Sequence, residues 1–241
     1  MARLAAVLLS VMVVAGCETV ERPSYGDVKK VGVASLAGNV IYHTRHIPFL
    51  GDDTGTNFIH EWRLARYIES LVTEYIHQYG AAQVVPLDID HPRLFVDYHD
   101  PSPGMFGDRF NYARVAATIE EAARTAGVDT YLTVEPMDKP RFAPMLAGGL
   151  GFYSDRRLFY QQDCFYNLMR ISVWRVGQPA PEYGIYSDRT CIRTDIEWQR
   201  RIDDYDESTQ RAIEAGLKSV IASDVQSILY SLGFFKSKPS K

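Results

Sequence analysis

The sequence has few cysteines, no excess of basic residues and no apolar run of membrane-spanning length. Lys and Arg number 26 against 30 Asp and Glu, and the formal net charge of −4 predicts no nucleic-acid partner. The longest apolar run, residues 4–15, is shorter than the about 20 residues that a spanning helix needs. No repeat with a period of about 20 to 50 residues occurs. These absences exclude a charge-driven nucleic-acid binder, a polytopic membrane protein and a repeat array.

Motifs with a known catalytic mechanism are also missing. The chain contains no His-Glu-x-x-His pair and no Gly-x-Ser-x-Gly elbow. Residues 51–56, which are rich in Gly and Asp, lack the Gly-Lys-Ser/Thr ending of a phosphate loop, and Asp52 and Asp53 would repel phosphate. We read this stretch as a loop that leads to a helix capped by Asn57. The sequence therefore predicts no catalytic residue, no metal and no cofactor.

One stretch keeps an alternative open. His91, Asp97, His99 and Asp100 lie within ten positions, and imidazole with carboxylate is ligand chemistry for zinc and other divalent metals. His43 and His46 form a second near pair. Neither spacing matches a known metal motif, and Asp and His are also common in exposed loops. The alternative function is thus a periplasmic metal-binding or hydrolytic protein that uses residues 91–100.

The amino terminus has the order of a bacterial lipoprotein signal. Arg3 precedes the apolar residues 4–15, and the run ends in Val-Ala-Gly-Cys at Cys17. This ending resembles the lipobox of bacterial lipoproteins. The resemblance implies that residues 1–16 are removed, that Cys17 carries a diacylglycerol anchor, and that residues 17–27 form the acylated N-terminus and a short tether. Glu18, where inner-membrane retention usually shows Asp, implies the outer membrane, on its periplasmic face.

The other two cysteines fit an exported protein. With Cys17 taken by lipid, Cys164 and Cys191 remain in an oxidising compartment. Residues 168–176 and 183–191 read as two strands of a hairpin centred near Gly177, which brings positions 164 and 191 opposite each other. We predict a Cys164–Cys191 disulfide, and two separate buried thiols are the alternative.

The apolar patterns predict an α/β domain. Strands are expected at residues 28–36, 83–87, 128–134, 168–176 and 183–191, and helices at 57–79, 112–126 and 208–232. Residues 39–45 extend the first strand or return as an edge strand, and residues 88–109 read as irregular. The order β-α-β-α-β-β-β-α predicts helices packed on a mixed five-stranded sheet. One domain then covers residues 28–235, with an insertion at 136–159 and a tail at 236–241.

Three short segments support a family resemblance. They are Val31-Gly32-Val33 in the first strand, residues 126–132 at a helix-to-strand join and residues 173–177 at the hairpin turn. Together with the element order they resemble the periplasmic α/β domain of the curli-secretion lipoprotein and the N-terminal domain of the Tol-Pal translocation protein. Such domains scaffold, oligomerise or secrete across the envelope and are not enzymes. The resemblance implies the same kind of work here.

The most unusual composition after the signal is at residues 143–159. Glycines at 148, 149 and 151 are interleaved with large apolar side chains. We read this segment either as a surface for an envelope partner or a second copy of the chain, or as a loop folded over its own core. The function expected from the sequence is that of a membrane-anchored periplasmic lipoprotein that acts by protein contact in envelope assembly, secretion or transport.

Overall fold

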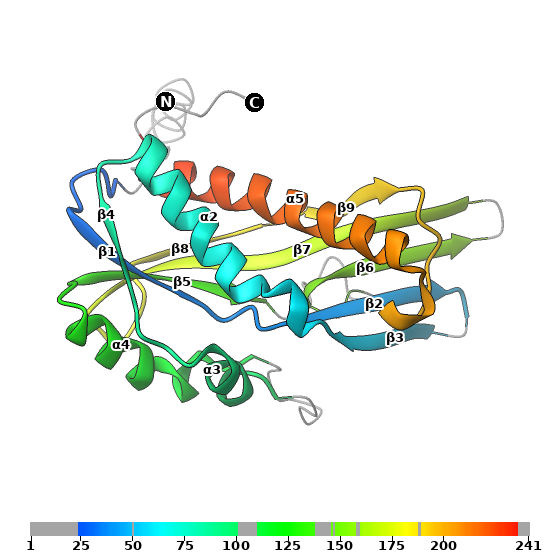
Figure 1. Cartoon of the computed structure of the whole chain (residues 1–241), viewed down its shortest axis with the longest axis horizontal. Helices are drawn as coiled ribbons and strands as arrows, with labels where there is room; N and C mark the ends of the chain where they lie inside the picture. The colour runs from blue at the N-terminus through cyan, green and yellow to red at the C-terminus, as the bar shows by residue number, and fades with distance from the viewer. Residues whose placement is uncertain are drawn as a thin grey trace, which may run out of the picture.

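The protein is a mixed α/β domain in the computed structural model, which describes residues 24–49, 51–100, 110–137, 146, 148–157, 160–187 and 189–235 (Figure 1). The predicted signal, Cys17 and residues 236–241 lie outside this part of the chain. Helices cover both faces of one long curved sheet. The α/β class predicted from the sequence is confirmed.

The described residues form a sheet of nine strands. Their bounds are β1 Lys30–Ser35, β2 Val40–Ile47, β3 Gly51–Phe58, β4 Gln83–Pro86, β5 Thr130–Pro136, β6 Gly149–Arg157, β7 Tyr160–Arg175, β8 Tyr183–Tyr186 and β9 Arg189–Thr194. The order is β3-β2-β6-β7-β5-β1-β4, and β8 and β9 also pair with β7. The strand pairs β1–β4, β1–β5 and β2–β6 are parallel, and the others are antiparallel.

The long strand β7 joins two halves of this sheet. Its C-terminal part pairs with β5 and β8, and with β1 and β4 these strands form what we call the helix-covered half. Its N-terminal part pairs with β6 and β9, and with β2 and β3 these form the hairpin half. The predicted count of five strands and the predicted element order are wrong. Within each half, strands pair across β7 in the order β4-β1-β5-β7-β8 on one side and β3-β2-β6-β7-β9 on the other.

In the described part of the chain, four helices accompany the sheet. They are α2 Leu64–Tyr79, α3 His91–Tyr98, α4 Ala116–Thr125 and α5 Glu207–Ser231, with short 3-10 turns at His60–Trp62, Tyr112–Arg114 and Ile202–Asp204. Helices α2 and α5 lie side by side on one face, and α3 and α4 cover the other (Figure 1). Apolar residues on α2 recur every three or four positions and are buried, as in Ile68, Val72 and Ile76.

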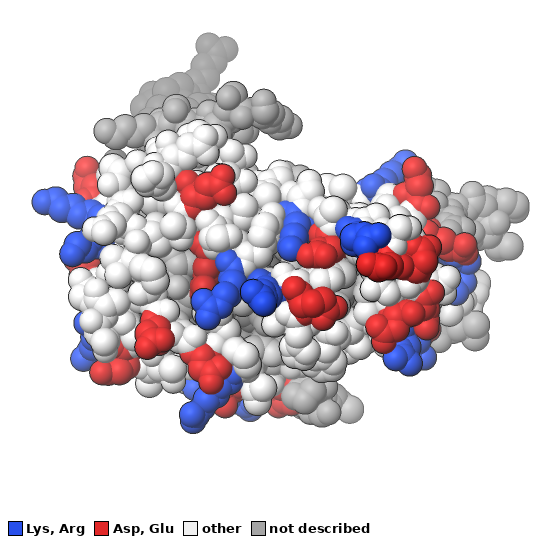
Figure 2. Space-filling model, in the orientation of Figure 1, with Lys and Arg blue, Asp and Glu red and all other residues white. Residues whose placement is uncertain are grey.

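The surface over α2 and α5 carries no field of one sign. Figure 2 shows acidic and basic side chains interspersed on this face, without a continuous patch of either. Ion pairs one helical turn apart account for part of this mixture, such as Arg211 with Glu207 and Lys218 with Glu214.

Residues 51–56, predicted as a loop, and residues 57–58, predicted as the start of a helix, form strand β3 instead. β3 pairs along its whole length with β2, so β2 is an interior strand and β3 is the edge. Asn57 does not cap a helix. Its Oδ1 accepts a hydrogen bond from the backbone N–H of Ile202 (2.8 Å), and α2 begins seven residues later, at Leu64. A polar, glycine-rich sequence is a poor strand former. Residues 51–58 are a strand because they form hydrogen bonds with β2 along their whole length.

The predicted insertion at 136–159 contains a central strand. β6 lies between β2 and β7, and its Leu150 and Phe152 are buried. A Cβ at position 151 would collide with the Tyr42 carbonyl oxygen and the Tyr166 ring, so glycine here permits close strand packing rather than flexibility.

The disulfide prediction is confirmed. Cys164 on β7 is bonded to Cys191 on β9, with 4.9 Å between their Cα atoms. In the pairing of β7 with β8, Val173 lies opposite Tyr183. The pairing of β7 with β9 contains an irregularity between Phe165 and Asn167, which shifts the register before Cys164. The bond therefore ties β9 to the hairpin half.

Candidate functional site

A groove with a volume of about 340 Å³ lies between α3, the β1–β2 connection and the region where β3 leads into α2. We call it the α3 groove. Among the residues that the structure describes, no Asp, Glu, Lys or Arg lines it. Its lining is Gly38, Asn39, Val40, Phe58, His60, Ala65, His91, Pro92, Phe95, Val96 and His99. The groove thus suits an uncharged, largely apolar occupant.

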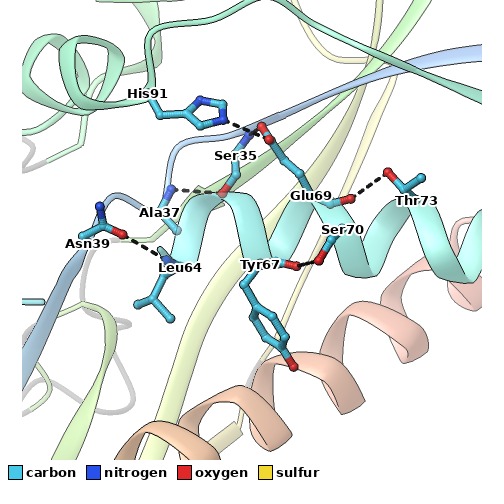
Figure 3. Close-up of polar contacts among 9 residues, drawn as sticks. All are labelled: Ser35, Ala37, Asn39, Leu64, Tyr67, Glu69, Ser70, Thr73 and His91. Carbon is cyan, nitrogen blue, oxygen red and sulfur yellow. Dashed lines mark hydrogen bonds and ion pairs between the residues drawn. The ribbon is translucent and has the colours of Figure 1, made fainter. Parts of the chain in front are cut away.

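Glu69 on α2 holds two walls of the groove together (Figure 3). Its Oε1 accepts a hydrogen bond from the backbone N–H of Ser35 at the end of β1 (3.0 Å), and its Oε2 lies 2.9 Å from Nε2 of His91. The Glu69 and His91 side chains are 20% and 11% exposed, so the contact is largely shielded from water. One carboxylate therefore connects the sheet, α2 and the first turn of α3.

The start of α2 is fixed by the loop after β1. Asn39 Oδ1 accepts a hydrogen bond from the backbone N–H of Leu64 (2.9 Å), which satisfies one of the free donors of the first helical turn (Figure 3). The residue before the helix, Arg63, has a φ of 47° and cannot provide this contact from its own side chain. A cap from a residue 25 positions earlier replaces the local cap that we expected.

Helix α3 lies close against this loop. Gly38 has a φ of 63°, and a Cβ at this position would collide with the ring of Phe95. Both the left-handed backbone and the close ring therefore require glycine. At the start of α3, the Asp90 side chain accepts a hydrogen bond from the N–H of Arg93 (3.2 Å), and Pro92 occupies the first turn.

The rim of the groove exposes large apolar side chains. Phe58 at the end of β3 is 63% exposed, and Val96 on α3 is 71% exposed. Phe58 stacks on His60, with ring centroids 6.3 Å apart. Two such residues beside an uncharged groove are typical of a surface that another molecule covers.

The structure disperses the predicted His and Asp set. Residues 91–98 are helical rather than irregular, so His91 and His99 lie at opposite ends of α3. His91 contacts Glu69, whereas His99 Nε2 lies 3.1 Å from the Tyr42 hydroxyl and its ring stacks on Phe95. Asp97 is exposed and 3.9 Å from Arg93.

Asp100 belongs to a different contact, 3.8 Å from Arg114. Within the residues that the structure describes, no group of three or more His, Cys, Asp or Glu side chains is placed to hold a metal ion. His91 and His99 do line the same groove, but as parts of its wall that contact different elements.

The second pair, His43 and His46, is also separated. His43 is fully buried in β2, with Nδ1 2.8 Å from the Gln199 carbonyl oxygen and Nε2 without a hydrogen-bond partner among the described residues. Burial lowers its pKa to about 4 from the ordinary value of 6.5, partly offset by the hydrogen bond to Gln199. His46 instead contacts Asp52 on the surface at 2.8 Å.

Residues 143–159 contribute less free surface than expected. Leu150, Phe152 and Tyr153 are buried in β6. Residues 143–145, 147, 158 and 159 lie outside the described part of the chain. Among the residues that the structure describes, no helix has the length and apolarity to cross a membrane.

Sequence reasoning did not find three residues that form the site: Glu69, Gly38 and Asn39. Glu69 reads as one more polar position on an amphipathic helix, and its partners lie 34 residues before it and 22 after it. No local signal marks contacts over such distances. We expected Asn57 to cap this helix, so the sequence did not indicate that a distant partner was needed.

Comparisons with known proteins add little. No protein-family model matches the chain, and no curated protein matches it. Among solved structures it is similar to a dodecameric PelC variant from Paraburkholderia phytofirmans, with 13% sequence identity and a TM-score of 0.36 over 88% of this chain and 93% of that chain. A likeness this distant supports no conclusion about function.

Proposed function

We propose that this protein is a lipoprotein anchored to the outer membrane through Cys17, on the periplasmic face, and that its domain acts by protein contact in envelope assembly, secretion or transport. The observation that carries the contact function is the α3 groove, which is uncharged and has Phe58 and Val96 on its rim. The lipobox-like ending at Cys17 supports the anchor. The partner would insert apolar side chains into the groove and is either another envelope protein or a second copy of this chain.

Site-specific photo-cross-linking in intact envelopes tests the contact. A photoreactive phenylalanine analogue at position 58 or 96 should give the same cross-linked product. At Tyr186, an exposed aromatic position on β8 (57% exposed), it should not. Equal products from all three positions, or none from 58 and 96, would refute the groove as the contact surface. Light scattering of the detergent-solubilised protein then distinguishes a defined oligomer from a monomer with a different partner.

Fractionation tests the anchor separately. Cys17→Ala should release the protein from the membrane fraction into the soluble periplasm, because the acyl chains supply the membrane affinity. If the variant remains in the membrane fraction, the lipid anchor is wrong.

The alternative, a metal-binding or hydrolytic function of residues 91–100, gains no support from the positions of these residues. Its test is calorimetry with zinc on the wild type and on His91→Ala and His99→Ala. A stoichiometric site lost in both variants would favour this alternative over the contact function.

A further inference from the structure

A second pocket, with a volume of about 560 Å³, opens where the domain begins. It lies at the end of the helix-covered half, where residues 24–30, the turn between α4 and β5, and the last residue of β7 meet. These elements gather at the left of Figure 1. In contrast to the α3 groove, its wall is charged, with Lys29, Lys30 and Arg175 beside Asp27 and Asp129.

Only part of this charge is neutralised within the domain. Arg175 donates hydrogen bonds to the Thr130 hydroxyl (2.7 Å) and to Glu182 (3.1 Å), which fix its guanidinium. Lys29 and Lys30 form no ion pair with any residue that the structure describes, and neither does Asp27. The pocket lining therefore includes two ammonium groups and one carboxylate that pair with no described residue.

The tether sets how far this pocket lies from the membrane, and this step rests on the proposed anchor. The path from Cys17 to Ser24 is seven residues long and reaches at most about 25 Å. Tyr25 is 8% exposed and its ring stacks on Phe234 with centroids 5.4 Å apart, so the point where the tether meets the domain is fixed. An acylated Cys17 thus keeps this end of the domain near the lipid headgroups.

We infer that this pocket binds a phospholipid headgroup that carries both a phosphate and an amine, that is, phosphoethanolamine. Lys29, Lys30 and Arg175 provide donors for the phosphate, and Asp27 and Asp129 accept from the ammonium. A purely anionic headgroup would meet the two carboxylates in the lining, whereas a zwitterionic one matches both signs. The pocket volume lies in the usual range for small-ligand sites.

Vesicle flotation of the full mature chain with Cys17→Ala tests this site without the covalent anchor. The protein should float with phosphatidylcholine vesicles that contain phosphatidylethanolamine and bind less to vesicles with phosphatidylglycerol instead. Lys29→Gln with Lys30→Gln should weaken flotation by about fivefold or more, since both lysines donate charge-assisted hydrogen bonds to the headgroup phosphate. Asp27→Asn with Asp129→Asn should remove the preference for ethanolamine.

The matched control is Arg200→Gln with Arg201→Gln, another adjacent cationic pair, whose members pair with Asp53 and Asp203. It should leave flotation unchanged. Equal losses of flotation from the arginine and lysine substitutions, or no loss from the lysine substitutions, would overturn the site. A preference for phosphatidylglycerol vesicles would overturn it as well. Soluble glycerophosphoethanolamine should displace the protein and inorganic phosphate should not. Displacement by both would assign the pocket to free phosphate instead.

These results separate the two proposals. If Cys17→Ala is released in cells but the purified chain shows no preference for ethanolamine vesicles, the anchor holds and the headgroup site fails. If Cys17→Ala stays in the membrane fraction of cells, the anchor fails regardless of the vesicle result.

Discussion

The helix-covered half and the hairpin half of the sheet are stabilised by different means. In the first, β1 pairs in parallel with β4 and β5 between two helix layers, and apolar side chains such as Val31, Leu132 and Ile119 pack beside a smaller set of buried polar ones on β1, β5 and β7. In the second, most strand pairs are antiparallel, and the disulfide joins β7 to β9. The polar residues buried there are His43, Thr44, Asn57, Ser154, Asp155, Asp163 and Asn167.

The buried polar groups of the hairpin half make its stability depend on specific contacts. An apolar interior tolerates changes that keep its volume, whereas buried polar groups are costly unless each finds its partner. Asn167, for example, donates to Asp224 on α5 at 2.6 Å, and Asp224 also accepts from Ser187 at 2.6 Å. The hairpin half therefore depends on a few particular contacts and should fail first when these are removed.

The largest expected effect is from Phe152→Ala in β6. Phe152 is fully buried and packs 5.4 Å from Phe165 and 5.7 Å from His43, measured between ring centroids. Its removal should lower the free energy of unfolding by about 4 kcal/mol. Hydrogen exchange should increase in β2 and β6 before β1 and β4. An equal increase in all four strands would mean that the halves unfold as one unit.

The next effect is that of the disulfide. Because the bonded residues are 27 positions apart in sequence, replacing both cysteines with Ala should cost about 3.5 kcal/mol on the chain-entropy model. Denaturant unfolding with and without reductant measures it, and the variant should no longer respond to reductant. A loss of protection centred on β5 rather than β9 would contradict the assignment of this bond to the hairpin half.

Acid should act on the same half through His43. Because burial lowers its folded-state pKa to about 4, its contribution to stability is complete above pH 6.5 and is lost as the pH falls toward 4. The expected loss over this window is about 3 kcal/mol. His43→Gln should flatten the pH dependence of the unfolding free energy, whereas the exposed His77→Gln should not. If the unfolding free energies of the two variants depend on pH with the same slope, His43 is not the source of the acid sensitivity.

The smallest of these effects lies in the helix-covered half. Glu69→Gln weakens the contacts to Ser35 and His91 and should cost about 1 to 2 kcal/mol. Glu74→Gln, at an exposed position on the same helix, should change stability by less than about 0.5 kcal/mol. Hydrogen exchange should report the loss mainly at α3. Equal effects of the two substitutions would mean that Glu69 does not hold the groove together.

Local patterns predicted much of the helix-covered half. Apolar residues on one face of α2 and α5, the glycines that follow helices, and the buried runs of β1 and β5 are visible in the sequence. Gly127 and Gly233, with φ values of 67° and 77°, end α4 and α5 as expected. These signals are local because a helix makes its backbone hydrogen bonds within itself.

The candidate site was predicted only in part. His91 and His99 were noted for their chemistry, and both line the α3 groove, but a metal site required them to meet and they do not. The apolar surface was expected in residues 143–159, whereas the exposed residues that form the groove rim are Phe58 and Val96. Both come from segments predicted as a helix or as irregular chain.

The sequence by itself determined the α/β class, the main helices and the position of the disulfide, because periodicity and hairpin symmetry depend on neighbours along the chain. Tertiary structure alone decided that the polar stretch β3 and the glycine-rich stretch β6 are strands, because their hydrogen-bond partners lie on other segments. It also decided that Glu69 joins β1 to α3. The physical reason is the same in each case: a distant partner, rather than the local composition, satisfies these polar groups.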